Sequence, residues 1–383
     1  MAVPGARERS HTSRGGWLKR TALGAAVVAL LPFGASVAVS GTAAAAYDPA
    51  GFDFYVDSSM GSIKNRIFRA ADGSTDRVVY LLDGERAESD LNGWEEYTKI
   101  PAALAKFNIN VVMPVGGQSS FYADWNEPSS FNGVNPDGSA LPGSDSGSAV
   151  SGWTETSGKS YTYMWETYLT QTLRDALRDR LGFSSTRNGV FGLSSGGTAA
   201  LVMAAYHPDQ FVYAGSLSGY LYMSAPGMRE ALRLAMIAAG GYNIDSMAPA
   251  GSEKWARMDP YSFAPQLITN GTRLFISAGS AIPAQQDLAS ADAVIQGMPL
   301  EAIALANTKA FQSRMQTLGY ENVTYDFPSM GVHNWGQWEQ VANRLIPDMA
   351  QHIGKPLPPG SQPPPPAEGQ QPPGEGQQPA PQN

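Results

Sequence analysis

The segment Gly192-Leu193-Ser194-Ser195-Gly196 contains the side chain best suited to do chemistry, a serine between two glycines. It is the only G-x-S-x-G sequence in the chain, and it follows the apolar run 189–191 and precedes the small-residue run 197–205. A strand, a sharp turn and a helix in this order form a nucleophile elbow, which raises the serine hydroxyl above a sheet. Ser194 is therefore predicted as a nucleophile. The alternative is an ordinary connection rich in glycine and serine.

A serine nucleophile needs a base, usually histidine, and the chain has four histidines. His11 lies in the basic N-terminal segment, His207 precedes a proline at the end of the helix after the serine, and His352 is near the C-terminal tail. His333 follows the last predicted strand, and the carboxyl end of a parallel strand is a common place for catalytic groups. Elimination and position both favour His333, against the alternative of a surface or core histidine.

An acid that orients the histidine is expected between Ser194 and His333, because proteins with a nucleophile elbow of this kind carry the residues in the order serine, acid, histidine. The candidates after the predicted strand 274–277 are Asp287, Asp292 and Glu301. Spacing alone favours Asp287, which is nearest to the strand. The alternative for all three is a solvated loop carboxylate.

Short apolar runs rich in β-branched residues alternate with helical patterns along the chain. Residues 161–181 place apolar side chains three and four positions apart, which predicts one amphipathic helix. Such alternation indicates an α/β fold with a mostly parallel sheet flanked by helices, and the elbow makes it an α/β-hydrolase fold. The predicted strands are 78–82, 109–113, 189–193, 211–215, 274–277 and 323–327, and further helices are predicted at 195–206, 306–317 and 335–352.

Two segments interrupt the alternation. Residues 126–160 are rich in Gly, Ser, Asn, Asp and Pro, which predicts a long surface insertion. Residues 220–270 contain Met-rich and Ala-rich helical pieces and are predicted to form a lid-like insertion, with a surface excursion as the alternative.

The two ends of the chain differ from the part between them. Residues 1–46 combine five basic residues, an apolar run and a closing Ala-rich stretch, which predicts a cleaved secretory signal peptide rather than a membrane anchor. Residues 355–383 are mostly Pro, Gln and Gly, which predicts a disordered tail. One α/β domain is expected over 47–354, in a protein that is secreted and associated with the cell envelope.

Composition excludes several classes of function. The formal net charge is −8, and it becomes more negative once the basic leader is removed, which argues against nucleic-acid binding. The chain has no cysteine, so disulfides, thiolate metal sites and a cysteine nucleophile are excluded. The predicted chemistry needs no metal and no cofactor.

Several separated motifs resemble one known group of proteins. They include the runs 80–84, 92–94 and 113–122, Trp165-Glu166-Thr167, the segment 204–208, the segment 213–218 and His333-Asn334-Trp335. Together with Ser194 they resemble the secreted mycolyltransferases of the antigen 85 type and their corynebacterial relatives. The resemblance covers nearly all of residues 54–353.

The resemblance implies roles for further residues. The family's triad carboxylate lies in a Leu-Glu pair ahead of a helix with Phe-Gln, which here selects Glu301 over Asp287. The family's oxyanion hole uses two backbone N–H groups, here those of Glu85 and Ser195. Its trehalose site corresponds to a polar and aromatic set, namely Asp83, Arg86, Asn92, Asn334 and Trp335. For Asp83 and Arg86 the alternative is a structural ion pair.

The chain also departs from the family it resembles. Glu85 stands where a leucine is usual, Ser195 replaces a methionine, and Ala278 replaces a cysteine found in some members. The insertion 126–160 replaces a short disulfide-bearing loop. Because the oxyanion hole uses only backbone groups, catalysis is expected to survive, but the carboxylate of Glu85 bears on the choice of acceptor.

The expected function is transfer of a mycolyl group from trehalose monomycolate through an acyl-serine. The expected acceptors are a second trehalose monomycolate or the arabinogalactan of the cell wall. The runs 221–238 and 281–300 are expected to hold the alkyl chains. The alternatives are a secreted carboxylesterase, in which water is the acceptor, and a surface adhesin that binds a fibronectin-like host matrix protein.

Overall fold

The computed structural model describes Met1 and residues 48–129, 161–289 and 293–354. The chain divides into two units, Met1–Val37 and Ala38–Asn383, and the described strands and helices all belong to the second unit. Beyond Met1, the predicted signal peptide lies outside the described residues. The predicted tail, Asp292 and most of the insertion 126–160 lie outside them too.

Eight strands of the described residues form one sheet in the order β1-β2-β4-β3-β7-β8-β9-β10, and the two others form a separate two-stranded sheet. The pairs β1–β2 and β2–β4 are antiparallel, and every neighbouring pair from β4 to β10 is parallel. All six predicted strands are present, within two residues at each end. The bounds are β1 Gly51–Ser58, β2 Gly61–Phe68, β3 Val78–Leu82, β4 Asn110–Pro114, β7 Asn188–Leu193, β8 Phe211–Leu217, β9 Arg273–Ser277 and β10 Val323–Asp326.

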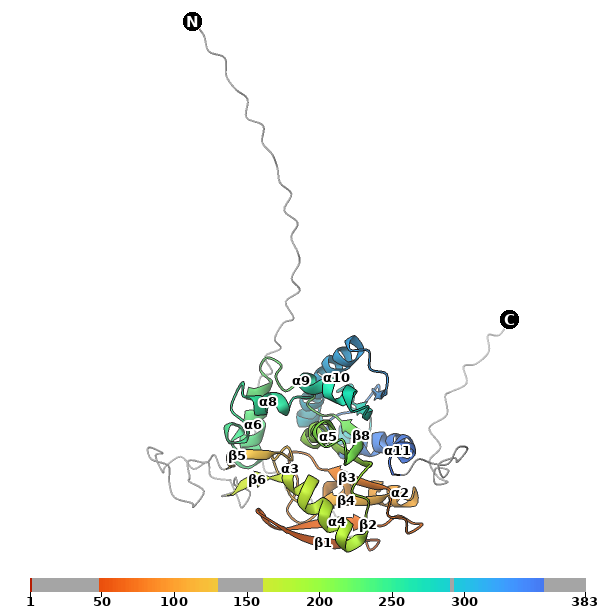
Figure 1. Cartoon of the computed structure of the whole chain (residues 1–383). Coiled ribbons are helices and arrows are strands. Elements are labelled where there is room, and N and C mark those ends of the chain that lie inside the picture. Colours follow the sequence, from red (N-terminus) through yellow and green to blue (C-terminus); the bar gives the residue numbers. More distant parts are fainter. Residues whose placement is uncertain (2–47, 130–160, 290–292, 355–383) are drawn as a thin grey trace, which may run out of the picture. The chain divides into compact units, whose positions relative to one another are not determined.

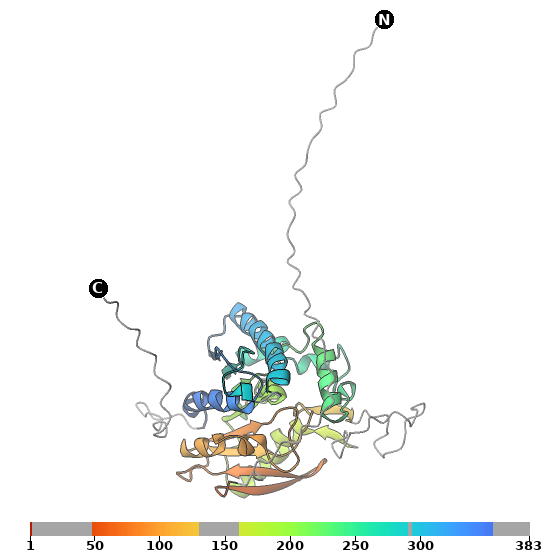
Figure 2. The same cartoon turned by 180° about the vertical axis from the view of Figure 1, so that it is seen from behind.

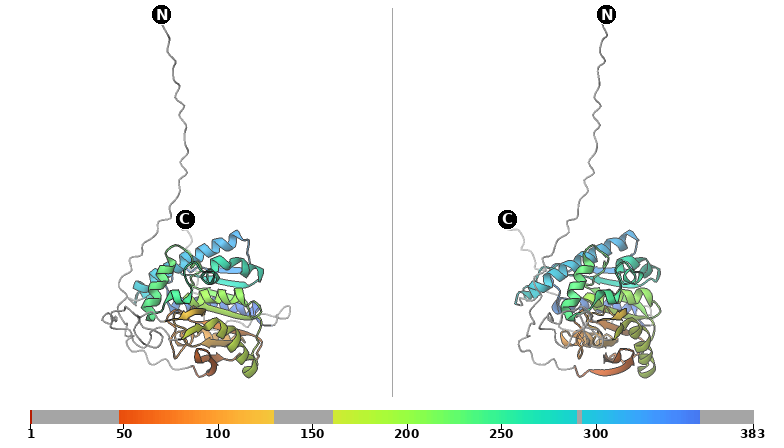
Figure 3. Two further views of the ribbon diagram at one scale, coloured as in Figure 1. Left: turned by 60° about the vertical axis from the view of Figure 1, so that its left-hand side comes forward. Right: turned by 90° about the vertical axis from the view of Figure 1, so that its left-hand side faces the viewer.

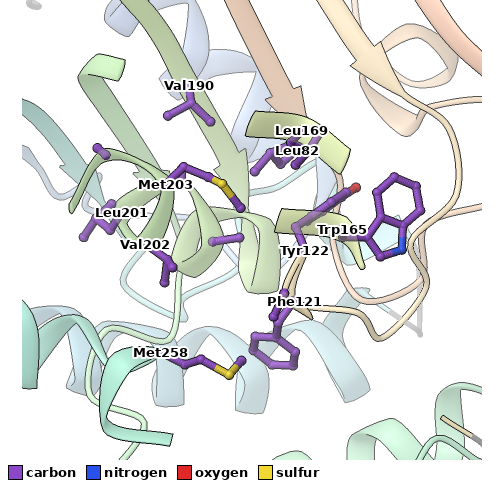
Figure 4. Packing of buried hydrophobic residues seen from close by; sticks show 14 of the residues in the cluster. Leu82, Phe121, Tyr122, Trp165, Leu169, Val190, Leu201, Val202, Met203 and Met258 are labelled. Carbon is purple, nitrogen blue, oxygen red and sulfur yellow. The ribbon is translucent and has the colours of Figure 1, made fainter. Parts of the chain in front are cut away.

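Helices cover both faces of this sheet (Figure 1). One hydrophobic cluster joins the sheet to α4 (Leu173–Leu181), α5 (Ser194–Tyr206), α9 (Pro260–Thr269) and α10 (Met298–Thr317). Figure 4 shows part of it, with Leu82 and Val190 of the sheet near Met203 of α5. A second cluster joins the other face to α1 (Gly93–Glu96), α2 (Ile100–Lys106) and α11 (Trp335–His352), and α2 and α11 lie side by side (Figure 2).

The segment 161–181 differs from its prediction. It begins as β6 (Thr162–Met164), passes through α3 (Trp165–Thr167) and η1 (Tyr168–Thr172), and becomes a regular helix only in α4. The predicted apolar face is nevertheless buried, from Tyr163 to Leu177. β6 pairs with β5 (Asp124–Pro128), so the first residues of the predicted insertion are a strand. The rings of Trp125 and Tyr163 pack edge to face across β5 and β6, and this cross-strand pair favours a strand over the predicted helix at residues 162–164.

The segment 220–270 forms short helices: α6 (Met228–Gly240), α7 (Ile244–Met247), α8 (Glu253–Arg257) and α9. The green α6 and the blue α10 lie on the side away from the β1–β2 hairpin (Figure 3). Leu221, Met223, Leu232 and Met236 are buried in the first hydrophobic cluster. Helix α10 follows two short helical segments, the 3₁₀-helix η2 (Asp287–Ala289) and the π-helix η3 (Ala293–Gly297). None of the described helices is long and apolar enough to cross a membrane.

Candidate active site

Ser194 lies at the junction of β7 and α5, where the chain turns sharply from strand to helix. Its φ is 52°, a left-handed conformation that costs energy for a residue with a side chain. The neighbouring glycines allow this turn. A Cβ on Gly196 would lie 2.2 Å from the carbonyl oxygen of Asp83, and one on Gly192 would lie 2.6 Å from the backbone of Gly196. The G-x-S-x-G sequence therefore has the strained elbow geometry that the sequence predicts.

His333 and Glu301 are in direct contact. The Nδ1 of His333 lies 2.8 Å from Oε2 of Glu301, which is fully buried in the first turn of α10. The other carboxylate oxygen accepts hydrogen bonds from Ser218 Oγ at 2.7 Å, Gln337 Nε2 at 3.0 Å and the backbone N–H of Gly279. Burial alone would raise the pKa of Glu301, but the contact with His333 and these donors lower it. The pair is thus a histidine held by an ionised carboxylate.

Asp287, which spacing favoured as the acid, has other partners. Its Oδ1 accepts a hydrogen bond from Asn334 Nδ2 at 2.8 Å, and its Oδ2 accepts one from the N–H of Ala284 at 2.8 Å. Asn334 also caps α11 by accepting from the N–H of Gln337 at 3.0 Å. Asp287 therefore holds the residue that follows His333, while Glu301 contacts the imidazole itself.

Tyr220, which the sequence did not single out, links the serine and the histidine. Its ring stacks on the imidazole of His333, with centroids 6.4 Å apart and planes 16° apart. Its backbone N–H donates to Thr198 Oγ1 at 2.9 Å, in the helix that begins with Ser194. The helix that begins with Ser194 and the loop of His333 are therefore held together by a shared neighbour. A tyrosine in a loop after a strand carries no motif, so only the fold could reveal it.

The two predicted backbone donors border Ser194. The N–H of Ser195 is among the first in α5, and the first N–H groups of a helix have no acceptor within the helix. Glu85 follows Gly84, where an added Cβ would lie 3.6 Å from the Cβ of Ser194. The carbonyl of Glu85 accepts a hydrogen bond from the N–H of Ser119 at 2.9 Å, which fixes the loop. The loop that carries Glu85 and the N–H of Ser195 are thus both next to the serine.

The side chain of Glu85 is half-buried beside the same loop. Its Oε1 is 3.5 Å from Ser119 Oγ. Burial raises the pKa of the Glu85 carboxyl to about 7, and the opposing effects of Arg86 and Ser119 are smaller. A second ionisable carboxyl therefore lies near the serine, and it changes charge near neutral pH.

Asp83 and Trp335, both predicted to bind sugar, lie next to each other. The carboxylate of Asp83 accepts hydrogen bonds from the N–H groups of Gly84 and Gly93, both at 2.7 Å. A Cβ on Gly93 would lie 2.2 Å from the ring of Trp335 and 3.1 Å from Asp83 Oδ2. Burial raises the pKa of Asp83 to about 6, although these two amides lower it. The glycine thus allows an aromatic ring and a carboxylate to share one surface.

Arg86 and Asn92 have different environments. Arg86 is exposed, and its Nη2 donates to Gln296 Oε1 at 3.1 Å rather than forming the alternative ion pair with Asp83. Asn92 is buried, accepts from the N–H of Trp94 at 3.0 Å and donates to the carbonyl of Pro114 at 2.8 Å. Asn92 therefore holds the backbone of its loop in place through these two hydrogen bonds, while Arg86 lies at the surface.

Comparison with known proteins places this geometry in a family. The family model Esterase, described as "Putative esterase", matches residues 66–350. The chain is 36% identical over 330 residues to the diacylglycerol acyltransferase/mycolyltransferase Ag85C of Mycobacterium avium, across 85% of this chain and 86% of that protein. It is 33% identical over 349 residues to the Ag85B protein of Mycolicibacterium smegmatis, across 89% of this chain and 98% of that one. The chain belongs to the Ag85 acyltransferase/mycolyltransferase family.

A solved structure agrees with this Ag85-family assignment. The crystal structure of MPT51 (FbpC1) from Mycobacterium tuberculosis superposes with a TM-score of 0.63 and 28% sequence identity, over 79% of this chain and 98% of that chain. The predicted α/β-hydrolase fold and the predicted family resemblance are therefore both confirmed.

Two motifs that carry the Ag85 resemblance connect separate segments of the fold. Gln118 donates to the carbonyl of Ala239 at 2.9 Å and accepts from the hydroxyl of Tyr242 at 2.9 Å, which ties the loop beside Glu85 to the region of α6. Glu166 lies 2.7 Å from His207 Nε2 and also binds Arg257. His207 is thus held by its own carboxylate at the far end of α5. Within the described part of the chain, no group of three or more His, Asp or Glu side chains could hold a metal ion.

Proposed function

We propose that this Ag85-family protein transfers a mycolyl group through an acyl-enzyme formed on Ser194. The observation that carries the proposal is the 2.8 Å contact between His333 and a buried, ionised Glu301, beside a serine in a strained elbow. A histidine held in this way accepts the serine proton on its other ring nitrogen, and the carboxylate stabilises the imidazolium that forms.

The reaction has two halves. Ser194 Oγ attacks the ester carbonyl of the donor while His333 takes its proton, and the carbonyl oxygen becomes an oxyanion held by the N–H groups of Glu85 and Ser195. Collapse of this intermediate breaks the ester bond, and His333 returns the proton to the leaving sugar. A second sugar hydroxyl then attacks the acyl-serine with His333 as base, which restores Ser194.

The donor in this proposal is trehalose monomycolate. Asp83 and Arg86 offer charged groups to sugar hydroxyls, and the ring of Trp335 covers the apolar face of the sugar. Asn92 and Asn334 hold the two loops that carry these groups. The acceptor is a second trehalose monomycolate or the arabinogalactan of the cell wall, which agrees with export directed by the predicted signal peptide.

The acyl chains leave the site along the run 281–300. Exposed apolar side chains gather on the loops beside His333: Ile282, Leu288, Ile295 and Met330. These loops are joined, because Ile282 bridges to Gly331 and the N–H of His333 donates to the carbonyl of Gly297 at 3.1 Å. The apolar side chains of 221–238 are mostly buried in the core, so the run 281–300 fits an alkyl chain better.

The test uses a fluorophosphonate label and one pair of variants. Ser194→Ala should abolish labelling and turnover, whereas Ser195→Ala should keep both, because it retains the backbone N–H. Substantial transfer by Ser194→Ala would reject the proposal.

The second candidate function is hydrolysis at the same site, which the description of the matched family as an esterase favours. Both reactions share the acyl-enzyme and differ only in whether sugar or water attacks it. Binding of a host matrix protein stays a prediction of the resemblance alone.

A further inference from the structure

Trp338 is a buried side chain in the first turn of α11, and the mechanism above gives it no role. Its indole Nε1–H donates to Ser218 Oγ at 3.0 Å, and Ser218 Oγ donates to Oε1 of Glu301 at 2.7 Å. Its ring packs edge to face with the imidazole of His333, with centroids 4.9 Å apart and planes 86° apart. One tryptophan therefore contacts both members of the pair, His333 directly and Glu301 through a serine.

The chemistry of the three linked groups fixes the direction of their hydrogen bonds. An indole N–H only donates and an ionised carboxylate only accepts, whereas a serine hydroxyl has one hydrogen and does both. The indole of Trp338 therefore occupies a lone pair of Ser218 Oγ, and the single hydroxyl hydrogen points to Glu301. Loss of the indole N–H would remove one of the two bonds that set the rotation of this hydroxyl.

The backbone of Ser218 is held in a conformation that costs energy. Its φ is 53°, in the left-handed region where a residue with a side chain is strained. Its N–H donates to the carbonyl of Ser277 at 2.8 Å, which ties the end of β8 to the end of β9. Strain of this kind persists only where the surrounding structure holds it, and it is common at active sites. Here the strained residue places its hydroxyl between Trp338 of α11 and Glu301 of α10.

The two oxygens of the Glu301 carboxylate have different partners. Oε1 accepts from Ser218, from the N–H of Gly279 and from Gln337 Nε2, which is the neighbour of Trp338 in α11. Oε2 lies 2.8 Å from Nδ1 of His333. Because donors hold Oε1, the carboxylate is kept in the rotation that presents Oε2 to the imidazole.

We propose that Trp338 is a positioning residue for acyl transfer, and that it acts through Ser218 on the carboxylate of Glu301. The inference rests on the proposed function, because it concerns the same pair of Glu301 and His333. Trp338 takes no proton and binds no substrate. Its hydrogen bond raises the fraction of enzyme in which Glu301 holds the imidazole ready to take the serine proton. In a buried network of this kind, each bond strengthens the next.

The test removes the indole N–H of Trp338 and keeps the ring, because the ring also packs against Trp335 at a centroid distance of 5.3 Å. Benzothienylalanine has a sulfur in place of the N–H and nearly the same shape. We expect Trp338→benzothienylalanine to lower kcat by about tenfold, as for the loss of about one hydrogen bond, with KM changed by less than about twofold. The rate of fluorophosphonate labelling should fall by a similar factor, since labelling depends on the same base.

The matched control is the same replacement at Trp125 on β5. The indole N–H of Trp125 donates to the carbonyl of Ser120 at 3.0 Å, so each variant loses one buried hydrogen bond of the same length. Both variants should lower the melting temperature by a similar amount. Only the replacement at Trp338 should lower kcat, which separates positioning from stability.

A double-mutant cycle shows whether Trp338 acts through Ser218. Ser218→Ala leaves Trp338 in place and should lower kcat by about tenfold or more on its own. In the Ser218→Ala background, the replacement of Trp338 should cost less than about twofold further, because the link is already broken.

Three results would overturn the inference: wild-type kcat after the replacement of Trp338, wild-type kcat in Ser218→Ala, or equal losses from the Trp338 replacement with and without the Ser218 hydroxyl. The last result would mean that Trp338 only packs against His333. An active Ser194→Ala variant would instead reject the proposed function, so the two failures are distinguishable.

Discussion

Two carboxylates flank the serine and histidine, and their surroundings are opposite. Glu301 is fully buried but accepts hydrogen bonds from Ser218, Gln337 and Gly279 and contacts His333, so its pKa is lowered. Glu85 has a single weak donor in Ser119, so burial raises its pKa to about 7. The comparison shows that the supply of hydrogen-bond donors decides which carboxylate stays charged.

Removing the charge of Glu301 should have the largest effect. Glu301→Gln leaves the shape of the side chain but no anion to orient and stabilise the imidazolium, so kcat should fall by roughly a thousandfold or more. Asp287→Asn is the control and should cost far less, because Asp287 contacts Asn334 rather than His333. Steady-state kinetics of both variants measures the two losses. If Asp287→Asn lowers kcat more than Glu301→Gln does, Asp287 is the acid and the assignment of Glu301 is wrong.

The exposed guanidinium of Arg86 should affect whether the acyl group is transferred to a sugar or released as free acid. Arg86→Ala removes a group proposed to bind sugar hydroxyls, which the acceptor sugar also presents, so the ratio of acyl-trehalose to free acid should fall severalfold, while serine labelling stays unchanged. Lys106→Ala is the control, because it removes one exposed positive charge on α2, away from the proposed sugar site, and should leave the product ratio unchanged. An unchanged product ratio in Arg86→Ala would remove Arg86 from the acceptor site.

Glu85 should shape the dependence of activity on pH. Because its pKa is about 7, it is mostly neutral at about pH 6 and mostly ionised at about pH 8, where it opposes the oxyanion. Glu85→Gln should therefore raise kcat at the higher pH by a few-fold and change it little at the lower one. Glu88→Gln, at an exposed position in the same loop, should leave the pH profile as it is. A gain of equal size at both pH values would contradict a charge effect.

The smallest expected effect concerns stability. A carboxyl whose pKa is higher in the folded state than the ordinary 4.5 contributes stability below that ordinary value and loses it as pH rises through about 7. Glu85→Gln should therefore raise the melting temperature at about pH 8 by about 1–2 °C, since Glu85 is partly solvated, and should have no effect at about pH 4. Thermal unfolding at the two pH values measures this difference. If Glu85→Gln instead lowers the melting temperature at the higher pH, the ionised Glu85 carboxylate is stabilised by its partners in the folded protein.

The sequence predicted the parts of the site that depend on local pattern. The strand before Ser194, the glycines of the elbow and the loop that carries His333 all follow from short segments of the chain. Five of the six parallel strands were predicted because both of their faces are largely covered, so each is a mostly apolar run. The sixth, β10, lies at the sheet edge and is only half-buried. The β1–β2 hairpin was missed because it lies at the sheet edge, where β1 buries only alternate side chains.

The remaining parts depend on contacts between distant segments. Spacing favoured Asp287, whereas Glu301 contacts the imidazole because α10 begins beside the loop of His333. The family resemblance, not spacing, pointed to Glu301. Tyr220 belongs to no motif, and Ser218 belongs to one without a role predicted for it; both contact the site because β8 ends beside α5 and α10. The segment 161–181 shows the converse. Its apolar side chains are buried as the helical spacing predicted, although the first part of the backbone forms a strand and not a helix.

The most direct test of the central claim is the fate of a preformed acyl-enzyme. An enzyme acylated from trehalose monomycolate would be mixed with trehalose, and the acyl products would be separated and measured. If the site positions a sugar acceptor, oriented attack outcompetes water, and the product shifts from free mycolic acid to acyl-trehalose as trehalose is added. If trehalose leaves the product ratio unchanged, the protein is a hydrolase at this site and the transferase account is wrong.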